Sequence, residues 1–346
     1  MPSFSIEVEG EANPLSRQVL LSHLSSSLSS HHNLKTSAQQ FSNWERTSGY
    51  YALLQDLYAD FSLPQEVRFQ AIIQLKNGID KHWKKHSQHA ILQSEKVVIR
   101  DRAISLGVHE PVQSLALQNA LMLAKIVRYE YPNDWPDVFT TIIEHLRKAS
   151  QDPAAYQYTS NILMILLHVI KELAAGRLQK TKRSLQLISS ELLQVLGTLY
   201  LQTVELWINA PGELDMAAAR NSHSALKTLR RLLVSGFEHQ HREAEVKQFW
   251  DLLQDHQQNF WITRQRAEAY EVVATKHLLQ LAKLFLEMAR QHPAPFVLLG
   301  SMEILNRSWT IVNECAKLPN VNATFDWEVY RDGDSLTKTL LWTNWP

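Results

Sequence analysis

Three histidines are the first candidates for chemistry in this chain of 346 residues. On a helix, His82, His86 and His89 would share a face, and two helical histidines four residues apart can bind one metal ion. Three lysines lie in the same stretch, namely Lys81, Lys84 and Lys85. Because their positive charges would repel a cation, we interpret the stretch as a solvated basic helix end and predict no metal site.

Acidic residues near the end of the chain suggest a second metal, calcium. Asp332-Gly333-Asp334, together with Asp326, resembles part of a calcium loop, but the remaining ligands of an EF-hand are missing from their required positions. An ordinary polar turn explains these residues better. The sequence also lacks P-loop, GxSxG, HExxH and GxGxxG motifs. We therefore predict no cofactor and no enzymatic activity.

Two short basic clusters suit acidic partners. The first is Lys180, Lys182 and Arg183, and the second is Lys227, Arg230 and Arg231. Short clusters of this kind are more often solvated faces of helices, so the sequence leaves both interpretations open.

The composition excludes several classes of protein. Lys plus Arg equals Asp plus Glu at 35 each, so no overall basic excess indicates direct binding to nucleic acid or insertion at an anionic membrane. Cys315 is the only cysteine, which excludes an internal disulfide and fits a reducing compartment. Met1 to Glu11 has no basic and apolar leader pattern. The longest apolar run, Ile162–Leu167, is too short to span a membrane. We expect a soluble protein of the cytoplasm or nucleus.

The elements that must position any functional residue are helices. Only ten glycines occur, and apolar residues recur with a period of about 3.6 residues. The amphipathic segments predicted are 14–29, 36–60, 65–83, 88–106, 112–130, 135–149, 155–175, 182–208, 214–237, 244–258, 263–291 and 294–316. Paired, they give early units of roughly 40 to 47 residues and longer later ones, which is typical of HEAT or armadillo repeats. The predicted fold is an all-α solenoid of HEAT-type helix pairs, a right-handed superhelix.

The two ends of the chain do not follow this pattern of paired amphipathic helices. Phe4–Val8 alternates with period 2 but has no partner strand, so residues 1–13 are predicted to be a flexible tail. Residues 326–346 begin a further amphipathic helix that exposes leucines and tryptophans. Because a solenoid normally ends in a polar capping repeat, we expect the chain to be the N-terminal part of a longer protein.

One predicted helix, 65–83, carries a clear apolar stripe. Ile72, Leu75, Ile79 and Trp83 fall at i, i+3, i+7 and i+11. Gly78 lies inside this helix, where glycine costs about 1 kcal/mol relative to alanine. It either allows a close approach by a neighbouring element or is a tolerated kink.

Two short motifs carry a resemblance to a known family. Residues 75–83 read LKNGIDKHW, and residues 131–136 read YPNDWP. With the aromatic-rich stretch 41–54, they resemble the first three repeats of the importin-β (karyopherin) superfamily of nuclear transport receptors. The first motif is most similar to the importin-eleven-type branch. In such receptors the YPxxWP turn enters the second, B helix of a repeat.

The resemblance implies function by binding. Residues 14–150 would be an importin-β N-terminal domain that binds the GTP form of the small GTPase Ran, and residues 151–346 would be further HEAT repeats. Lys76 and Asn77 are the expected Ran contacts. Otherwise, Lys76 is a solvated residue and Asn77 a cap or a link between adjacent helices.

The other motif residues are expected to have structural roles. Aromatic side chains beside prolines usually fix a turn by packing. The residues assigned to this role are Trp83, Tyr131, Pro132, Trp135 and Pro136.

The resemblance further implies protein cargo, binding to nucleoporin Phe-Gly repeats, and shuttling between cytoplasm and nucleus through the pore. A HEAT-repeat scaffold with no part in transport is the alternative class. The two motifs favour a receptor, because a generic scaffold has no need of them.

Overall fold

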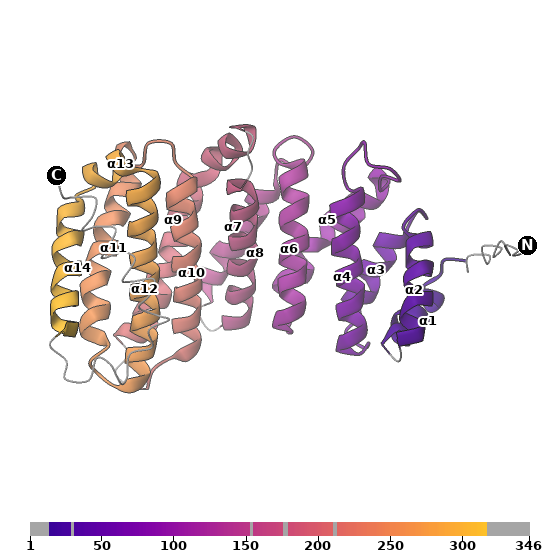
Figure 1. Cartoon of the computed structure of the whole chain (residues 1–346), viewed down its shortest axis with the longest axis horizontal. Helices are drawn as coiled ribbons and strands as arrows, with labels where there is room; N and C mark the ends of the chain where they lie inside the picture. The colour runs from indigo at the N-terminus through magenta and orange to yellow at the C-terminus, as the bar shows by residue number, and fades with distance from the viewer. Residues whose placement is uncertain (1–13, 29–30, 153–154, 176–178, 210–212, 317–346) are drawn as a thin grey trace, which may run out of the picture. The chain divides into compact units, whose positions relative to one another are not determined.

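The fold consists of helices over the residues that the computed structural model describes, which are 14–28, 31–152, 155–175, 179–209 and 213–316. Within these residues there is no β-strand (Figure 1). The helices are α1 (Arg17–Ser27), α2 (His31–Trp44), α3 (Tyr50–Ala59), α4 (Gln65–His82), α5 (Gln93–Val108), α6 (Gln113–Glu130), α7 (Val138–Gln151), α8 (Tyr156–Ala174), α9 (Gln179–Ile208), α10 (Met216–Ser235), η1 (Gln240–Arg242), α11 (Ala244–Thr263), α12 (Glu268–Gln291), α13 (Pro293–Leu298) and α14 (Ser301–Ala316).

Some predictions lie outside the described residues. They are the tail 1–13 with its strand-like segment, and the acidic turn and amphipathic helix of residues 326–346. Of the helices that are described, none combines the length and the hydropathy needed to cross a bilayer.

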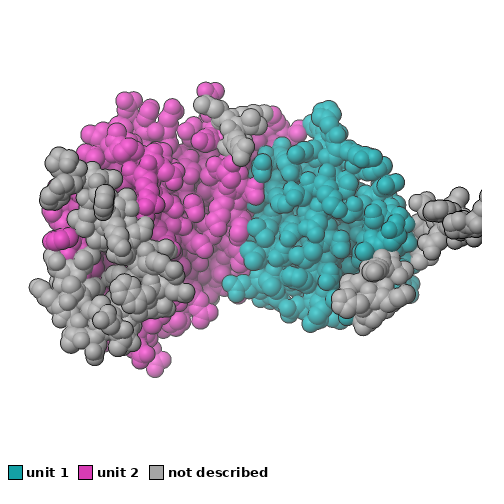
Figure 2. Space-filling model, in the orientation of Figure 1, with its two compact units in different colours: residues 1–129 teal, residues 130–346 magenta. Residues whose placement is uncertain are grey.

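The chain divides into two compact units, residues 1–129 and residues 130–346 (Figure 2). In unit 1, α1 packs on α2 and α3 on α4. In unit 2, the pairs are α7 with α8, α9 with α10 and α11 with α12. The second helices of successive pairs also pack together, since α10 lies against both α8 and α12. The predicted all-α fold of stacked helix pairs is confirmed.

Hydrogen bonds between equivalent positions of neighbouring pairs give the repeat length. In unit 1 the Gln55 Nε2 atom donates to the Ile99 carbonyl at 2.8 Å, and the two residues are 44 positions apart. In unit 2 the Tyr200 hydroxyl lies 2.8 Å from His256 Nδ1, and these residues are 56 positions apart. The longer repeat follows from longer helices, because α9 has 30 residues and α3 only 10. Short early units and longer later ones were predicted, and the structure confirms both.

Each unit has its own aromatic and aliphatic core. Trp44 and Tyr50 are almost fully buried in unit 1. In unit 2 the Trp207 and Phe260 rings stack with centroids 5.6 Å apart and an interplanar angle of 7°. Helix α8 is apolar on nearly every face and packs against α7, α9 and α10, which explains how such a helix can be accommodated.

Two predicted helices are each broken in the structure. Segment 36–60 contains the end of α2 and all of α3, separated at Gly49 with φ +86°. Segment 294–316 contains most of α13 and all of α14, separated at Gly300 with φ +88°. Both glycines have left-handed backbone, which side chains with a Cβ rarely adopt. Gly49 directly precedes α3, and Gly300 follows the C-cap of α13, where such a glycine commonly ends a helix.

Candidate functional site

Helix α4 carries the residues that the sequence singled out. Ile72, Leu75 and Ile79 are fully buried, so the predicted apolar stripe is confirmed. Asn77 is exposed on the opposite side of the helix, whereas Lys76 is half-buried at the edge of the stripe. The periodicity of α4 therefore directs Asn77 away from the core and places Lys76 at the boundary between core and surface.

Lys76 connects α4 to α6. Its ammonium group donates a hydrogen bond of 2.8 Å to Gln118 Oε1. Partial burial lowers the pKa of Lys76, the nearby positive charge of Lys125 lowers it further, and the carboxylate of Asp80 opposes the shift. Lys76, rather than Asn77, thus links the two helices. The Asn77 side chain has no hydrogen-bond partner within the described part of the chain.

A second pair of side chains continues this surface toward the end of α4. Lys125 on α6 forms a salt bridge of 2.8 Å with Asp80, and the Tyr129 hydroxyl lies 3.4 Å from the same carboxylate. The hydrogen bond from Lys125 lowers the pKa of Asp80. Lys84 places its ammonium 5.3 Å from the centroid of the Tyr129 ring.

We call these residues the α4–α6 face, defined as Lys76, Asn77, Asp80, Lys84, Gln118, Lys125 and Tyr129. Three ammonium groups surround one carboxylate, which leaves the face positively charged near neutral pH. These ammonium and amide donors lie on α4, on α6 and, for Lys84, in the loop after α4. They suit reversible, charge-assisted hydrogen bonds to acidic side chains and backbone carbonyls.

No motif in the sequence points to the α6 half of this face. Gln118 lies 42 residues after its partner Lys76, close to the 44-residue repeat of unit 1. A search about one repeat length after Lys76 was therefore a usable signal for its neighbour on α6.

The three histidines near the end of α4 do not share a helical face. The helix ends at His82, so His86 and His89 lie in the following loop. His82 Nδ1 lies 2.9 Å from the Gln88 carbonyl, and His82 Nε2 lies 3.4 Å from a carboxylate oxygen of Glu45. Among the described residues no three His, Cys, Asp or Glu side chains gather in a metal-binding arrangement.

Trp83 packs in the core of unit 1 directly after α4. Its side chain is 1% exposed. The Lys96 ammonium donates to the Trp83 carbonyl and lies 5.4 Å from the centroid of the indole ring. The tryptophan of the first motif therefore anchors the loop between α4 and α5.

Aromatic packing also orders the turn of the second motif. The Tyr131 ring meets Phe139 edge-on with centroids 4.8 Å apart, and Trp135 is 7% exposed. The backbone amides of Asp134 and Trp135 both donate to the Glu130 carbonyl, at 2.8 and 3.3 Å. These contacts have the structural character expected for the motif.

The position of that turn differs from the expectation. Pro132 follows a cis peptide bond and is half-buried, while Pro136 is exposed. The turn follows α6 and leads into α7, which packs on α8 as the first helix of its pair. The expectation that it enters a B helix was wrong, because the motif joins one repeat to the next.

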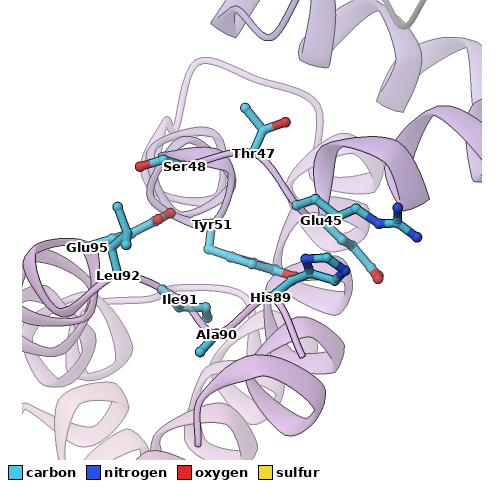
Figure 3. A pocket seen from close by; sticks show the side chains of 10 residues that line it. Glu45, Thr47, Ser48, Tyr51, His89, Ala90, Ile91, Leu92 and Glu95 are labelled. Carbon is cyan, nitrogen blue, oxygen red and sulfur yellow. The ribbon is translucent and has the colours of Figure 1, made fainter. Parts of the chain in front are cut away.

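A small pocket of about 150 Å³ lies in unit 1 beside the turn between α2 and α3 (Figure 3). Glu95 lines it and accepts hydrogen bonds from the amides of Gly49 at 3.0 Å and Ala52 at 2.9 Å. Glu45, also in its wall, accepts from Lys81 at 3.1 Å. Because both carboxylates already hold helices together, we assign this pocket no ligand.

Comparison with known proteins places the α4–α6 face in a family context. Residues 37–109 match the family described as Importin-beta N-terminal domain, and residues 113–238 match the one described as Exportin 1-like protein. The importin-beta-like protein KAP120 of Saccharomyces cerevisiae is 29% identical over 270 residues, 77% of this chain and 26% of KAP120. Human importin-11 is 27% identical over 277 residues, 76% of this chain and 27% of importin-11.

The solved structures that resemble this chain include another nuclear transport receptor. Lph2, described as a bidirectional nuclear transport receptor of S. cerevisiae, has a TM-score of 0.78 and 27% identity, and the match covers 91% of this chain and 31% of Lph2. The exportin Cse1, at 16% identity and a TM-score of 0.64 over 85% of this chain and 32% of Cse1, shows a likeness of fold alone.

This chain spans about a quarter of the length of the curated relatives KAP120 and importin-11. These relatives are transport receptors rather than enzymes, and their likeness to this chain confirms the resemblance to importin-eleven-type receptors. HEAT-type α-solenoids are the fold of its structural neighbours. The two family models and these relatives show that this chain is similar to the importin-β superfamily over most of its length.

Proposed function

We propose that this chain is the part of a nuclear transport receptor that binds Ran in its GTP form through the α4–α6 face. Two findings that concern the same helix support this most. The residues matching the Importin-beta N-terminal domain, 37–109, include all of α4. On that helix, exposed Asn77 and half-buried Lys76 lie on a positively charged surface shared with α6.

In this proposal the α4–α6 face contributes charge. The ammonium groups of Lys76, Lys84 and Lys125 meet carboxylates of the GTPase, and the exposed amide of Asn77 bonds to its backbone. Residues 14–150 would form the Ran-binding part, and residues 151–346 would continue the HEAT repeats and contribute to cargo binding. Binding to nucleoporin Phe-Gly repeats and shuttling through the pore belong to the same proposal.

The mechanism would be coupled binding, with no bond-breaking step. If Ran·GTP and cargo favour different conformations of the receptor, each lowers the affinity of the other by the same factor. A static HEAT-repeat scaffold is less favoured, because the relatives that match over three quarters of this chain are transport receptors.

The test is the affinity of the chain for Ran loaded with a non-hydrolysable GTP analogue, with Ran·GDP as the control. The proposal requires clear preference for the GTP form. Equal binding of the two forms would contradict it, since a receptor controlled by the nucleotide must distinguish them. Loss of binding to both would contradict the assignment of Ran binding to these residues.

A further inference from the structure

The second helices of three successive pairs in unit 2 are α8, α10 and α12, and α10 packs against the other two (Figure 1). Cationic side chains gather on these three helices. They are Lys171 on α8, Lys227, Arg230 and Arg231 on α10, and Lys276 and Lys283 on α12. We call this set the α8–α10–α12 basic surface. The second basic cluster of the sequence analysis forms its centre, so the helices bring together more positive charge than the sequence alone suggests.

These cations act on one another. The positive charges of Lys227, Arg231 and Arg230 add to partial burial in lowering the pKa of Lys171. The pKa of His223 on α10 is lowered to about 4 by burial and by cations of α10 and α12. Charges that influence one another in this way lie close together, and their mutual repulsion is a cost to the folded chain.

Two carboxylates offset only part of this charge. Glu287 on α12 lies 3.3 Å from Arg230 Nη1 and 3.7 Å from Arg231 Nη1. Glu172 on α8 is near enough to His168 to raise its pKa against the larger effect of burial. The six cations outnumber these two carboxylates, so positive charge predominates among the named residues. His168 and His223 stay neutral near physiological pH, because the pKa of each is lowered to about 4.

A partner can reach two cations of the surface. The side chain of Arg231 is 35% exposed, and Lys276 is exposed. The Nε atoms of Arg230 and Arg231 are buried and have no hydrogen-bond partner within the described structure, so a partner does not reach them. A guanidinium matches the two oxygens of a carboxylate, so an acidic partner can bond to the exposed part of Arg231.

The surface fits an acidic polypeptide better than a nucleic acid. Glu287 and Glu172 lie among the cations and would repel a continuous phosphate backbone, whereas a polypeptide can space its carboxylates between them. The chain as a whole has no basic excess.

We propose that the α8–α10–α12 basic surface binds an Asp/Glu-rich polypeptide segment of a protein cargo. The identification of the partner as cargo rests on the proposed function. The binding of an acidic segment does not.

The test is fluorescence anisotropy of a labelled poly-glutamate peptide with the full 346-residue chain, over a range of salt concentrations. The variant is Lys227→Gln/Lys276→Gln, which removes two charges without touching Arg230. The matched control is Arg242→Gln/Lys247→Gln, two exposed residues of η1 and α11 outside the surface. Thermal unfolding of both variants shows whether they fold like the parent chain.

The proposal predicts salt-sensitive binding by the parent chain, about tenfold weaker binding by the variant, and unchanged binding by the control. Absence of peptide binding, or equal loss in variant and control, would overturn it. Tighter binding of a single-stranded oligonucleotide of matched charge would also overturn it, in favour of a nucleic-acid surface. Ran·GTP binding by the same parent chain is scored separately, so failure of that assay affects only the proposed transport function.

Discussion

Gly78 on α4 and Tyr51 on α3 approach each other so closely that only glycine fits. A Cβ built on Gly78 would lie 2.0 Å from Tyr51 Cε1. Of the two interpretations that the sequence left open for this glycine, close approach by a neighbouring element is correct.

Gly78→Ala is therefore expected to lower the unfolding temperature, even though alanine is the better helix former by about 1 kcal/mol. Forcing a methyl group into a filled space costs about 1–3 kcal/mol. The matched control is Gly197→Ala in α9, whose Cβ would lie 3.1 Å from the movable ring of Phe249. Thermal unfolding followed by circular dichroism should show a larger loss for Gly78→Ala, and a stabilised Gly78→Ala protein would contradict the packing described.

The buried ion pair of unit 1 gives a second prediction. Arg68 and Glu110 form a salt bridge with their side chains 5% and 1% exposed, and Arg68 Nε also donates to the Tyr58 carbonyl at 2.8 Å. Arg68→Met leaves a buried carboxylate without its counter-charge, which typically costs about 3–5 kcal/mol.

The double variant Arg68→Met/Glu110→Gln should recover part of that loss, because it buries no unpaired charge. Denaturant unfolding of the two single variants and the double variant measures this coupling. If the loss of unfolding free energy in the double variant equals the sum of the losses in the two single variants, Arg68 and Glu110 do not act as a unit.

Much of the fold is predictable from the sequence because a helix repeats about every 3.6 residues, so the burial of Ile72, Leu75 and Ile79 follows from their spacing. The break at Gly49 is harder to predict, since the apolar pattern continues through it and only the backbone conformation reveals the turn. Lys76 was identified from its motif. Its partner Gln118 on α6 has no motif, and its role depends on the stacking of two repeats.

The histidines of unit 2 predict a dependence of stability on pH. Burial lowers the pKa of His168, His223 and His256 to about 4 and that of His277 to about 3. As the pH falls below about 6.5, these residues take up protons in the unfolded chain but not in the folded one. Stability is therefore fully present above that pH and decreases toward pH 4.

Each such histidine contributes up to about 1.4 kcal/mol per pH unit within this window. His168→Gln should reduce the slope with which the unfolding free energy falls as the pH is lowered. His86→Gln, at an exposed position of unit 1, should leave that slope unchanged. Equal slopes for the parent chain and His168→Gln would show that His168 does not titrate as described.

The central claim is that Ran·GTP binds at the α4–α6 face, and one measurement addresses it most directly. The affinity of Lys76→Glu for Ran carrying a GTP analogue is compared with those of the parent chain and of Lys247→Glu, an exposed charge reversal on α11. Circular dichroism verifies that each variant is folded. The account predicts that Lys76→Glu binds at least about tenfold more weakly while Lys247→Glu binds like the parent. Unchanged affinity of a folded Lys76→Glu protein would contradict it.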